Sequence, residues 1–338
     1  MSVNIAQIGV GKWGKNLLRN FASMEEIELS VVCDSSDKGC TIAQYDPRVK
    51  QVTRNWKEIP QREDVDAVVI ATPPETHYEI AKAFLEADKD VFVEKPITLD
   101  VEKAVELAKL AEDKKRILMV GHIMEYHPAV EKLKQYINSG ELGRLFYLYS
   151  SRINLGRVRS CENALWSFAP HDISILLYLL DEEPTRVSVT GASYLQKGIE
   201  DVVFVSLYFP DGIMGHIHTS WLDPHKSRKL TIVGSKKMAV FDDMEPAEKI
   251  RLYDKGVDMV TDYQTYGEYL SIRQGDILIP KIDIREPLRI ECQEFIKAVK
   301  SRKPPRTDGW DGVRVLKILE AASQSLKVNG SPIAIDKA

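Results

Sequence analysis

The chain has 338 residues, of which 44% are hydrophobic and 28% are charged, and its formal net charge is −4. This length favours two domains, and the composition is that of a globular protein. No basic excess indicates nucleic acid binding. The longest apolar stretches are too short to cross a bilayer, and the first residues lead directly into a core strand, so we expect neither a membrane anchor nor export.

The four cysteines give no sign of a metal or a disulfide framework. They show no C-x-x-C spacing and no histidines at zinc-binding distances along the chain. We therefore expect reduced thiols, a cytoplasmic location and no metal site. The residues are Cys33, Cys40, Cys161 and Cys292.

A glycine motif follows the first apolar strand, expected at residues 4–8. Its sequence is Gly9-Val10-Gly11-Lys12-Trp13-Gly14, and a helical pattern over 15–21 comes directly after it. Strand, G-x-G-x-x-G and helix is the order of a dinucleotide-binding turn. The three glycines then have separate roles: a tight turn, close approach of the backbone to a pyrophosphate, and close packing of the helix. The helix N-terminus offers N–H groups to the phosphates.

An acidic residue stands where this motif requires one. A second strand, expected over 28–33, ends at Asp34, about 25 residues after Gly9. A carboxylate at this place binds the adenosine ribose hydroxyls and repels a 2′-phosphate. NAD is therefore the expected cofactor, rather than NADP. The residue that argues against this choice is Lys38, a cation close to Asp34 in sequence.

Up to residue 122, short apolar runs alternate with helical patterns, which predicts a doubly wound parallel sheet, that is, a Rossmann domain. The expected strands after the first two cover 67–71, 90–93 and 116–120, and the expected helices cover 77–87 and 101–111.

Residues 123–338 change rhythm and predict an α+β domain with a mostly antiparallel, open sheet. Most of its strands are separated only by turn residues. The segment 254–284 could form a lid or an oligomer arm. Helices are expected over 129–138, 288–300 and 309–326, and strands over 145–153, 186–193, 202–209, 214–221, 229–233, 238–241 and 249–253.

Two residues are candidates for catalysis. Lys95 follows the strand at 90–93 within Glu94-Lys95-Pro96, and Pro96 restricts its backbone to extended angles. The alternative is a lysine tied to Glu94. His171 precedes a helix expected to begin at Ile173, and imidazole titrates near neutral pH, as a general acid/base must. A helix-capping pair with Asp172 is the alternative.

Together with the glycine motif and His171, Thr72-Pro73-Pro74-x-x-His77 and Glu94-Lys95-Pro96 resemble the glucose–fructose oxidoreductase / inositol dehydrogenase / MocA family. The resemblance covers the N-terminal half closely and the C-terminal half in outline. It implies NAD contacts at the glycine motif, and it implies a site between the domains where the lysine and histidine act on a substrate carbinol. It also implies a homodimer or homotetramer formed through the C-terminal sheet.

The later stretches are most similar to sugar dehydrogenases of the family, among them UDP-sugar 3-dehydrogenases. One residue departs from the pattern: where the family commonly has Asp four residues before the histidine, this chain has Ser167. A serine cannot stabilise an imidazolium as a carboxylate does. Asp172 could supply that charge, Lys95 could carry more of the proton transfer, or catalysis could be weak.

Other residues are weaker candidates, each with a structural alternative. His216 and His218 share a strand face without a third ligand, which favours a solvated or interface face over a metal. The remaining candidates for the cofactor are Lys12, Trp13, Thr72, Pro73, His77 and Glu94, and those for the substrate are Tyr126, Arg152, Asn154, Trp166, Ser167 and Asp172.

The sequence thus predicts an NAD-dependent oxidoreductase acting on a ring hydroxyl of a sugar, expected at C3, with a nucleotide sugar such as UDP-N-acetylglucosamine or its uronic acid as substrate. Two alternatives remain open. One is an NAD-dependent glycosidase that oxidises C3 transiently. The other is a non-catalytic, NAD-binding regulatory protein, for which Ser167 is the best argument.

Overall fold

The computed structural model describes residues 2–259 and 270–336, without the side chains of 258, 259 and 270. The chain divides into two compact units, the first formed by 1–126 with 285–316 and the second by 127–284 with 317–337. The sequence-based boundary at 122 lies near the first crossing. Residues 285–316, which the sequence analysis placed with the second domain, pack with the first unit. No helix among the described residues is long and apolar enough to cross a membrane.

The first unit contains a six-stranded parallel sheet in the order β3-β2-β1-β4-β5-β6. The strand order reverses between the neighbouring strands β1 and β4, because the chain crosses to the other half of the sheet after β3. Ligands of such sheets bind at the carboxyl ends of the strands at this point. The strands are β1 (Val3–Ile8), β2 (Ile27–Cys33), β3 (Val52–Thr53), β4 (Ala67–Ile70), β5 (Asp90–Glu94) and β6 (Leu118–Gly121). The sequence analysis missed the two-residue strand β3.

Helices complete the first unit. They are α1 (Gly14–Ala22), α2 (Asp37–Gln44), α3 (His77–Glu86), α4 (Val101–Asp113) and α7 (Pro287–Ser301), with 3-10 turns η1 (Trp56–Glu58), η2 (Pro74–Thr76) and η3 (Ile123–Tyr126). The sequence analysis did not predict α2, which Ser36 caps by accepting a hydrogen bond from the Gly39 N–H.

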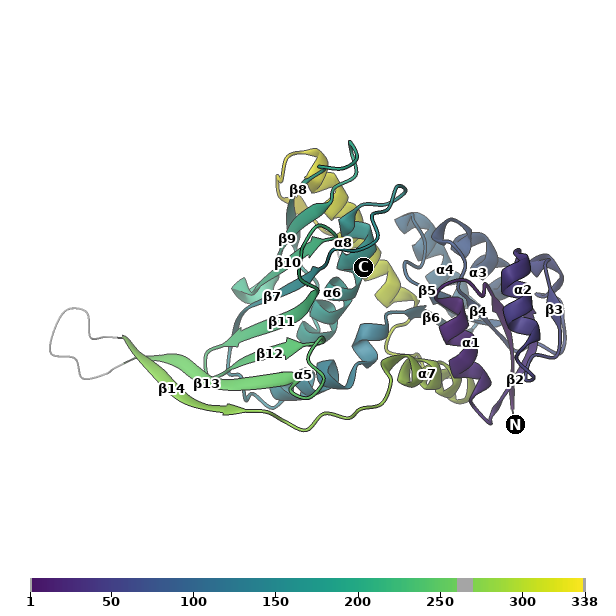
Figure 1. The fold of residues 1–338 in the computed structure, drawn as a ribbon, viewed down its shortest axis with the longest axis horizontal. Helices are drawn as coiled ribbons and strands as arrows, with labels where there is room; N and C mark the ends of the chain where they lie inside the picture. Colours follow the sequence, from purple (N-terminus) through teal and green to yellow (C-terminus); the bar gives the residue numbers. More distant parts are fainter. Residues whose placement is uncertain (1, 260–269, 337–338) are drawn as a thin grey trace. The chain divides into compact units, whose positions relative to one another are not determined.

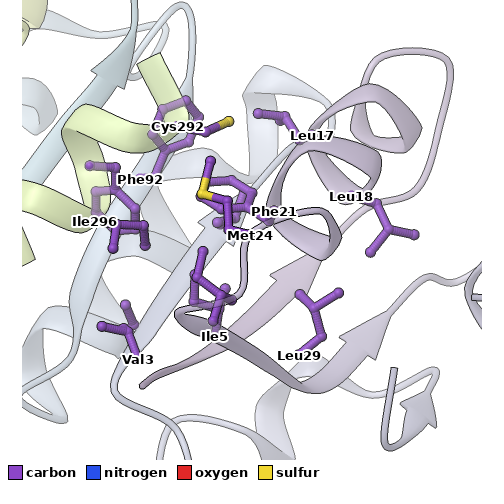
Figure 2. Packing of buried hydrophobic residues seen from close by; sticks show 14 of the residues in the cluster. Val3, Ile5, Leu17, Leu18, Phe21, Met24, Leu29, Phe92, Cys292 and Ile296 are labelled. Atoms are coloured by element: carbon purple, nitrogen blue, oxygen red, sulfur yellow. The ribbon is translucent and has the colours of Figure 1, made fainter. Parts of the chain in front are cut away.

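Helix α7 belongs to the first unit because its apolar face completes that unit's core. Phe295 packs edge-to-face on Phe92 and Phe21, with ring centroids 5.7 and 6.4 Å away. Figure 2 shows Cys292 and Ile296 from the same helix within this cluster. Burial of these side chains offsets the entropy lost when a segment so distant in sequence is ordered here.

The second unit contains a nine-stranded sheet in the order β14-β13-β12-β11-β7-β10-β9-β8-β15, which can be followed in Figure 1. Only the β7–β10 pair is parallel among the described pairings, so the expected antiparallel character is confirmed. The strands are β7 (Leu145–Ile153), β8 (Arg186–Ala192), β9 (Val202–Tyr208), β10 (Met214–Ser220), β11 (Ser227–Gly234), β12 (Met238–Asp242), β13 (Ile250–Met259), β14 (Leu270–Leu278) and β15 (Ile333–Ala334).

Three helices accompany this sheet: α5 (Pro128–Asn138), α6 (Ala164–Leu180) and α8 (Gly309–Lys327), the last of which begins in the first unit's segment. A 3-10 turn, η4 (Pro210–Gly212), joins β9 to β10. The segment 254–284, unassigned by sequence, supplies the end of β13 and all of β14; its residues 260–269 lie outside the described part of the chain.

The prediction that a helix begins at Ile173 is wrong. Helix α6 begins at Ala164, where the Asn163 side chain accepts a hydrogen bond from the Trp166 N–H at 3.2 Å. Pro170 lies inside the helix, although an internal proline costs about 3 kcal/mol. Most residues of α6 are buried, and this burial compensates the cost. His171 and Asp172 are therefore in mid-helix, which excludes a helix-capping role for the pair.

The glycine turn is fixed by steric contacts. Gly9 has a φ of +94°, and a Cβ there would lie 2.6 Å from the Ala71 carbonyl oxygen. A Cβ on Gly14 would lie 2.2 Å from the Gly9 carbonyl oxygen, whereas one on Gly11 would meet nothing within 4 Å. This geometry fits a tight turn at Gly9 and close packing of the helix at Gly14, the roles given to these two glycines in the sequence analysis.

We expect Gly14→Ala to destabilise the protein and Gly11→Ala to leave its stability nearly unchanged. Overpacking costs about 1–3 kcal/mol, which corresponds to a fall of about 2–12 °C in the thermal unfolding midpoint. Scanning calorimetry of the two variants and the unaltered chain measures this. Equal midpoints for both variants would mean that α1 moves away from β1 without cost, contrary to the steric argument.

Candidate functional site

The glycine turn connects to the ends of two strands. Within the turn, the Val10 N–H donates to the Asp34 carboxylate at 2.7 Å, and the Trp13 indole N–H donates to Glu94 at 2.5 Å. The buried Gln7 side chain supports the turn from below by donating to the carbonyl oxygens of Gly9 and Gly14. Sequence analysis missed Gln7, because a glutamine in an apolar strand gives no signal of its partners.

Three hydrogen bonds hold the Asp34 carboxylate. Besides Val10, the N–H and hydroxyl of Ser36 donate to its Oδ1 at 2.8 and 2.7 Å. Burial raises the pKa of Asp34, but the hydrogen bonds from Ser36 and Val10 together bring it below its ordinary value. The residue therefore presents an ionised carboxylate at the carboxyl end of β2, as recognition of ribose hydroxyls requires.

Gly39 is a functional residue that the sequence analysis did not name. A Cβ on this residue would lie 2.1 Å from the Asp34 carboxyl carbon, so only glycine leaves the carboxylate in its position. A glycine within a helical segment is a recognisable signal of close approach, and it could have been noticed.

The residues of the turn fit a dinucleotide. Space is open above Gly11, and Lys12 and Trp13 are exposed beside it. The N-terminus of α1 and the Asp34 carboxylate supply the anion- and ribose-binding chemistry that NAD needs.

His77 bridges the loops that follow β4 and β5. It is buried, and its ring nitrogens lie 2.8 Å from the Pro96 carbonyl oxygen and 2.9 Å from that of Thr72. Burial lowers the pKa of His77, against the opposite effect of these two hydrogen bonds. The residue thus holds the Thr72-Pro73 loop against the loop that carries Lys95, rather than presenting its ring to solvent.

Glu94 and Lys95 end β5 beside the glycine turn. Burial raises the pKa of Glu94 to about 7, against the lowering effects of the Trp13 hydrogen bond and the Lys95 charge. Lys95 is half-buried, its backbone N–H lies 3.3 Å from the Glu94 carboxylate, and the Lys95–Pro96 peptide bond is cis. Gly121, at the end of β6, leaves room for the Glu94 side chain, because a Cβ there would lie 3.0 Å from Oε2.

A buried polar cluster follows β6. His122 Nδ1 lies 2.6 Å from the Asp311 carboxylate, to which Arg314 also donates at 3.1 Å. Burial, and then the neighbouring Asp311, raise the pKa of Glu125 well above its ordinary value. Asp311 thus meets His122 with its Oδ2 atom and accepts from Arg314 with its Oδ1 atom. The cluster fits a structural connection between η3 and α8.

Tyr126 lies in the core of the first unit. Its ring is buried, and its hydroxyl lies 3.1 Å from the Thr307 hydroxyl. This is the position of an aromatic side chain packed in the core, and it gives no support to the substrate contact predicted for Tyr126.

Within the second unit, Arg152 and Asp172 form a buried ion pair. The Arg152 Nε and Nη2 groups donate to the Asp172 oxygens at 2.6 and 3.3 Å. The substrate contact predicted for Arg152 competes with this pair, and so does the alternative in which Asp172 supplies charge to His171. A buried pair of this kind holds α6 on β7.

Three further candidates lie nearby. The Trp166 indole N–H donates to the Ser323 hydroxyl of α8 at 3.0 Å, and Asn154 follows β7 with its backbone N–H on the Ser220 carbonyl oxygen. Ser167 is buried and donates its hydroxyl to Glu162 at 2.9 Å. His171, half-buried on α6, is one helical turn beyond Ser167.

We expect Asp34→Ala and Gly39→Ala both to raise the Kd for NAD, because the first removes the Asp34 carboxylate and the second displaces it. The expected rise is about tenfold or more, which corresponds to about 1.4 kcal/mol of lost contact. Asp34→Ala should also narrow the preference for NAD over NADP, because it removes the repulsion of a 2′-phosphate. Calorimetric titration with each cofactor measures both effects. Gln44→Ala, exposed on the same helix as Gly39, is the control, and tighter binding of NADP by the unaltered chain would contradict the role of Asp34.

Comparison with known proteins agrees with this geometry. Residues 3–122 match the GFO/IDH/MocA oxidoreductase family, NAD-binding Rossmann fold, and residues 130–240 match the GFO/IDH/MocA C-terminal domain. UDP-N-acetylglucosamine 3-dehydrogenase from Acidithiobacillus ferrooxidans is 27% identical over 75% of this chain and 76% of its own. The NAD(+)-dependent scyllo-inositol 2-dehydrogenase of Bacillus subtilis is 26% identical over 99% of this chain and 96% of its own.

Among solved structures, levoglucosan dehydrogenase in complex with NADH and L-sorbose has a TM-score of 0.85, with 21% identity, over 100% of both chains. At this identity the likeness shows a common fold. The two matched domains, the glycine turn and the Glu94-Lys95-Pro96 segment together establish that the chain is an NAD-dependent oxidoreductase of the GFO/IDH/MocA family.

Proposed function

We propose that the protein is a sugar dehydrogenase that oxidises a ring hydroxyl, at C3, of a nucleotide sugar such as UDP-N-acetylglucosamine or its uronic acid. The observation that carries the proposal is the position of Lys95, directly after β5 on the same strand-end edge as the glycine turn and tied to it through Glu94 and Trp13. The relatives named for sugar and inositol oxidation support the substrate class.

NAD, when bound, supplies the acceptor for the hydride that leaves the carbinol carbon. The hydroxyl proton passes to His171 as the carbonyl forms, so His171 must be neutral at the start of oxidation. Lys95 donates a hydrogen bond to the same oxygen and stabilises the negative charge that develops on it.

The Glu94 carboxyl affects how strongly the neighbouring Lys95 ammonium is stabilised. With a pKa raised to about 7, its carboxyl is partly protonated at neutral pH, and it therefore stabilises the neighbouring ammonium less than an ordinary glutamate does.

Lys95→Ala and His171→Ala should each lower kcat by about 10²–10⁴ while NAD still binds, because a positioned acid/base contributes that much. The measurement is initial-rate kinetics on a panel of UDP-hexoses and free sugars, with NAD binding followed separately by titration. Undiminished turnover in either variant would remove that residue from the mechanism. Tight NAD binding without oxidation of any sugar by the unaltered chain would favour the regulatory alternative.

We also propose that the protein assembles as a homodimer or homotetramer through the outer face of the second sheet. One row on this face pairs Met214 with Tyr147 and Tyr208, and the next pairs His216 with Tyr149. The Phe204 ring stacks on His218 at 4.4 Å. Tyr147, Tyr149, Phe204 and Met214 are 39–44% exposed, an unusual concentration of large apolar side chains for a surface in water.

Phe204→Glu should dissociate this assembly, because a carboxylate would be buried against apolar groups of the second copy. Light scattering coupled to gel filtration gives the mass of the unaltered chain and the variant. Tyr194→Glu is the matched control, since Tyr194 is an exposed aromatic outside the sheet strands. A monomeric unaltered chain, or an assembly that survives Phe204→Glu, would contradict the interface.

For location we propose the cytoplasm, with a small-molecule substrate and neither nucleic acid nor a membrane as partner. The four cysteines are free thiols, and Cys33, Cys40 and Cys292 are buried, as in proteins kept reduced. The formal net charge of −4 gives no attraction to phosphate backbones or anionic lipid.

A further inference from the structure

The Glu162 carboxylate, just before α6, contacts Ser167, which lies one helical turn before His171. Ser167 and His171 are four residues apart in one helix, so their side chains lie one above the other on the same face, with Cβ atoms about 5–6 Å apart. Ser167 donates its hydroxyl proton to Glu162 Oε1 at 2.9 Å. A serine hydroxyl has one proton and two acceptor lone pairs, so with its proton directed at Glu162 its oxygen can accept from an imidazole N–H.

Glu162 is held in this place from two sides. Arg159 Nη1 lies 2.7 Å from the same Oε1 atom, and the neighbouring Asn163 donates its side-chain N–H to Glu200 at 2.6 Å while it caps the helix. The chain before α6 is thus folded back so that the Glu162 carboxylate meets the first turn of the helix. Its side chain is about a quarter exposed (27%).

Asp172 does not take this role. It is adjacent to His171 in sequence, but consecutive helix residues point about 100° apart, and both of its oxygens accept from Arg152. Its charge is therefore balanced by a guanidinium within the same buried pair.

Several charged groups near α6 have partners of their own. Arg159, paired with Glu162, is the cation that most directly opposes the proposed effect. Others are Arg152 of β7 with Asp172, Lys134 of α5 with Asp181, Glu200 with Asn163, and Asp201 with the Trp221 indole and the backbone N–H groups of Tyr194 and Leu195. On β10, His216 and His218 both stack on Phe204.

We propose that Glu162 is a positioning residue for His171, acting through the Ser167 hydroxyl. Glu162 orients the imidazole and stabilises its protonated form, as a carboxylate at position 167 would do directly. This inference rests on the proposed function, in which His171 takes the substrate's hydroxyl proton.

The test begins with Glu162→Gln, which keeps the acceptor oxygen and removes the charge. In the oxidation direction the rate rises with pH as His171 loses its proton. Removing the carboxylate lowers the pKa of His171, so the acid limb of the kcat/KM profile should move to lower pH, by about 0.5–1. At the same time kcat should fall about 3–10-fold while the Kd for NAD stays unchanged. Ser167→Ala should give the same displacement, since it breaks the same connection.

Rescue gives the sharper result. Ser167→Asp placed in the Glu162→Gln background should return the acid limb to its original pH, because it restores a carboxylate one turn from His171. Glu182→Gln, a neutralised exposed glutamate at the other end of the same helix, is the control and should leave the profile unchanged.

A second measurement does not depend on turnover. The NMR titration of the His171 imidazole in the NAD-free protein should show the same lowering of its pKa in Glu162→Gln and Ser167→Ala. If the titration and the rate profile both match those of the unaltered chain while His171→Ala is inactive, the positioning role is wrong and the proposed function stands. If no sugar is oxidised but the titration still shifts, the coupling to Glu162 stands and the proposed function fails.

Discussion

The absence of side-chain space at Gly9 and Gly14 is the constraint on which the rest of the candidate site depends. A Cβ at either residue would overlap a backbone oxygen, so only this sequence brings α1 so close to β1 and the end of β4. The turn held in this way then serves as an anchor. Its Val10 N–H fixes the Asp34 carboxylate, and its Trp13 indole fixes Glu94, next to Lys95. The Asp34 carboxylate and Lys95, the candidate catalytic lysine, are therefore positioned by one local packing arrangement.

Acidic groups in the first unit show how burial changes the chemistry of a carboxyl. Glu291 of α7 is fully buried, and neither of its oxygens has a hydrogen-bond partner among the described residues. Burial, with a further effect from Glu94, raises its pKa well above the ordinary value and so favours its neutral form. The cost of burying this polar group is offset by the aromatic packing of α7.

In the second unit, one helix carries two different uses of charge. The Arg152–Asp172 pair is buried and holds α6 on the sheet, whereas the Glu162–Ser167 hydrogen bond lies nearer the surface at the start of that helix. Ser167 and Asp172 of the same helix therefore have different partners, since a helix directs them to different faces. The pattern also shows why adjacency in sequence is a poor guide to the partner of a helical side chain.

The sequence by itself determined the parts that depend on local geometry. Glycine spacing, alternation of apolar runs and a carboxylate after the second strand predicted the Rossmann domain, its parallel sheet and the NAD-binding turn, because each follows from contacts between residues close in sequence or from a fixed strand order. Most helices and strands of the second unit were also predicted within a few residues. The start of α6 was not, since the cost of Pro170 is outweighed by burial against the sheet.

Only the tertiary structure decided which distant segments meet. An amphipathic pattern at 287–301 shows that a face is buried but not against which unit, and the packing of Phe295 with Phe21 and Phe92 settled that question. The partners of Asp172, Tyr126 and Ser167 were likewise decided by three-dimensional packing. A side chain takes the partner that is closest and best desolvated. That partner can be remote in the sequence, as Thr307 is for Tyr126. Local rules determine the turn that holds a cofactor, while burial and charge pairing across the fold determine the partner of each polar side chain.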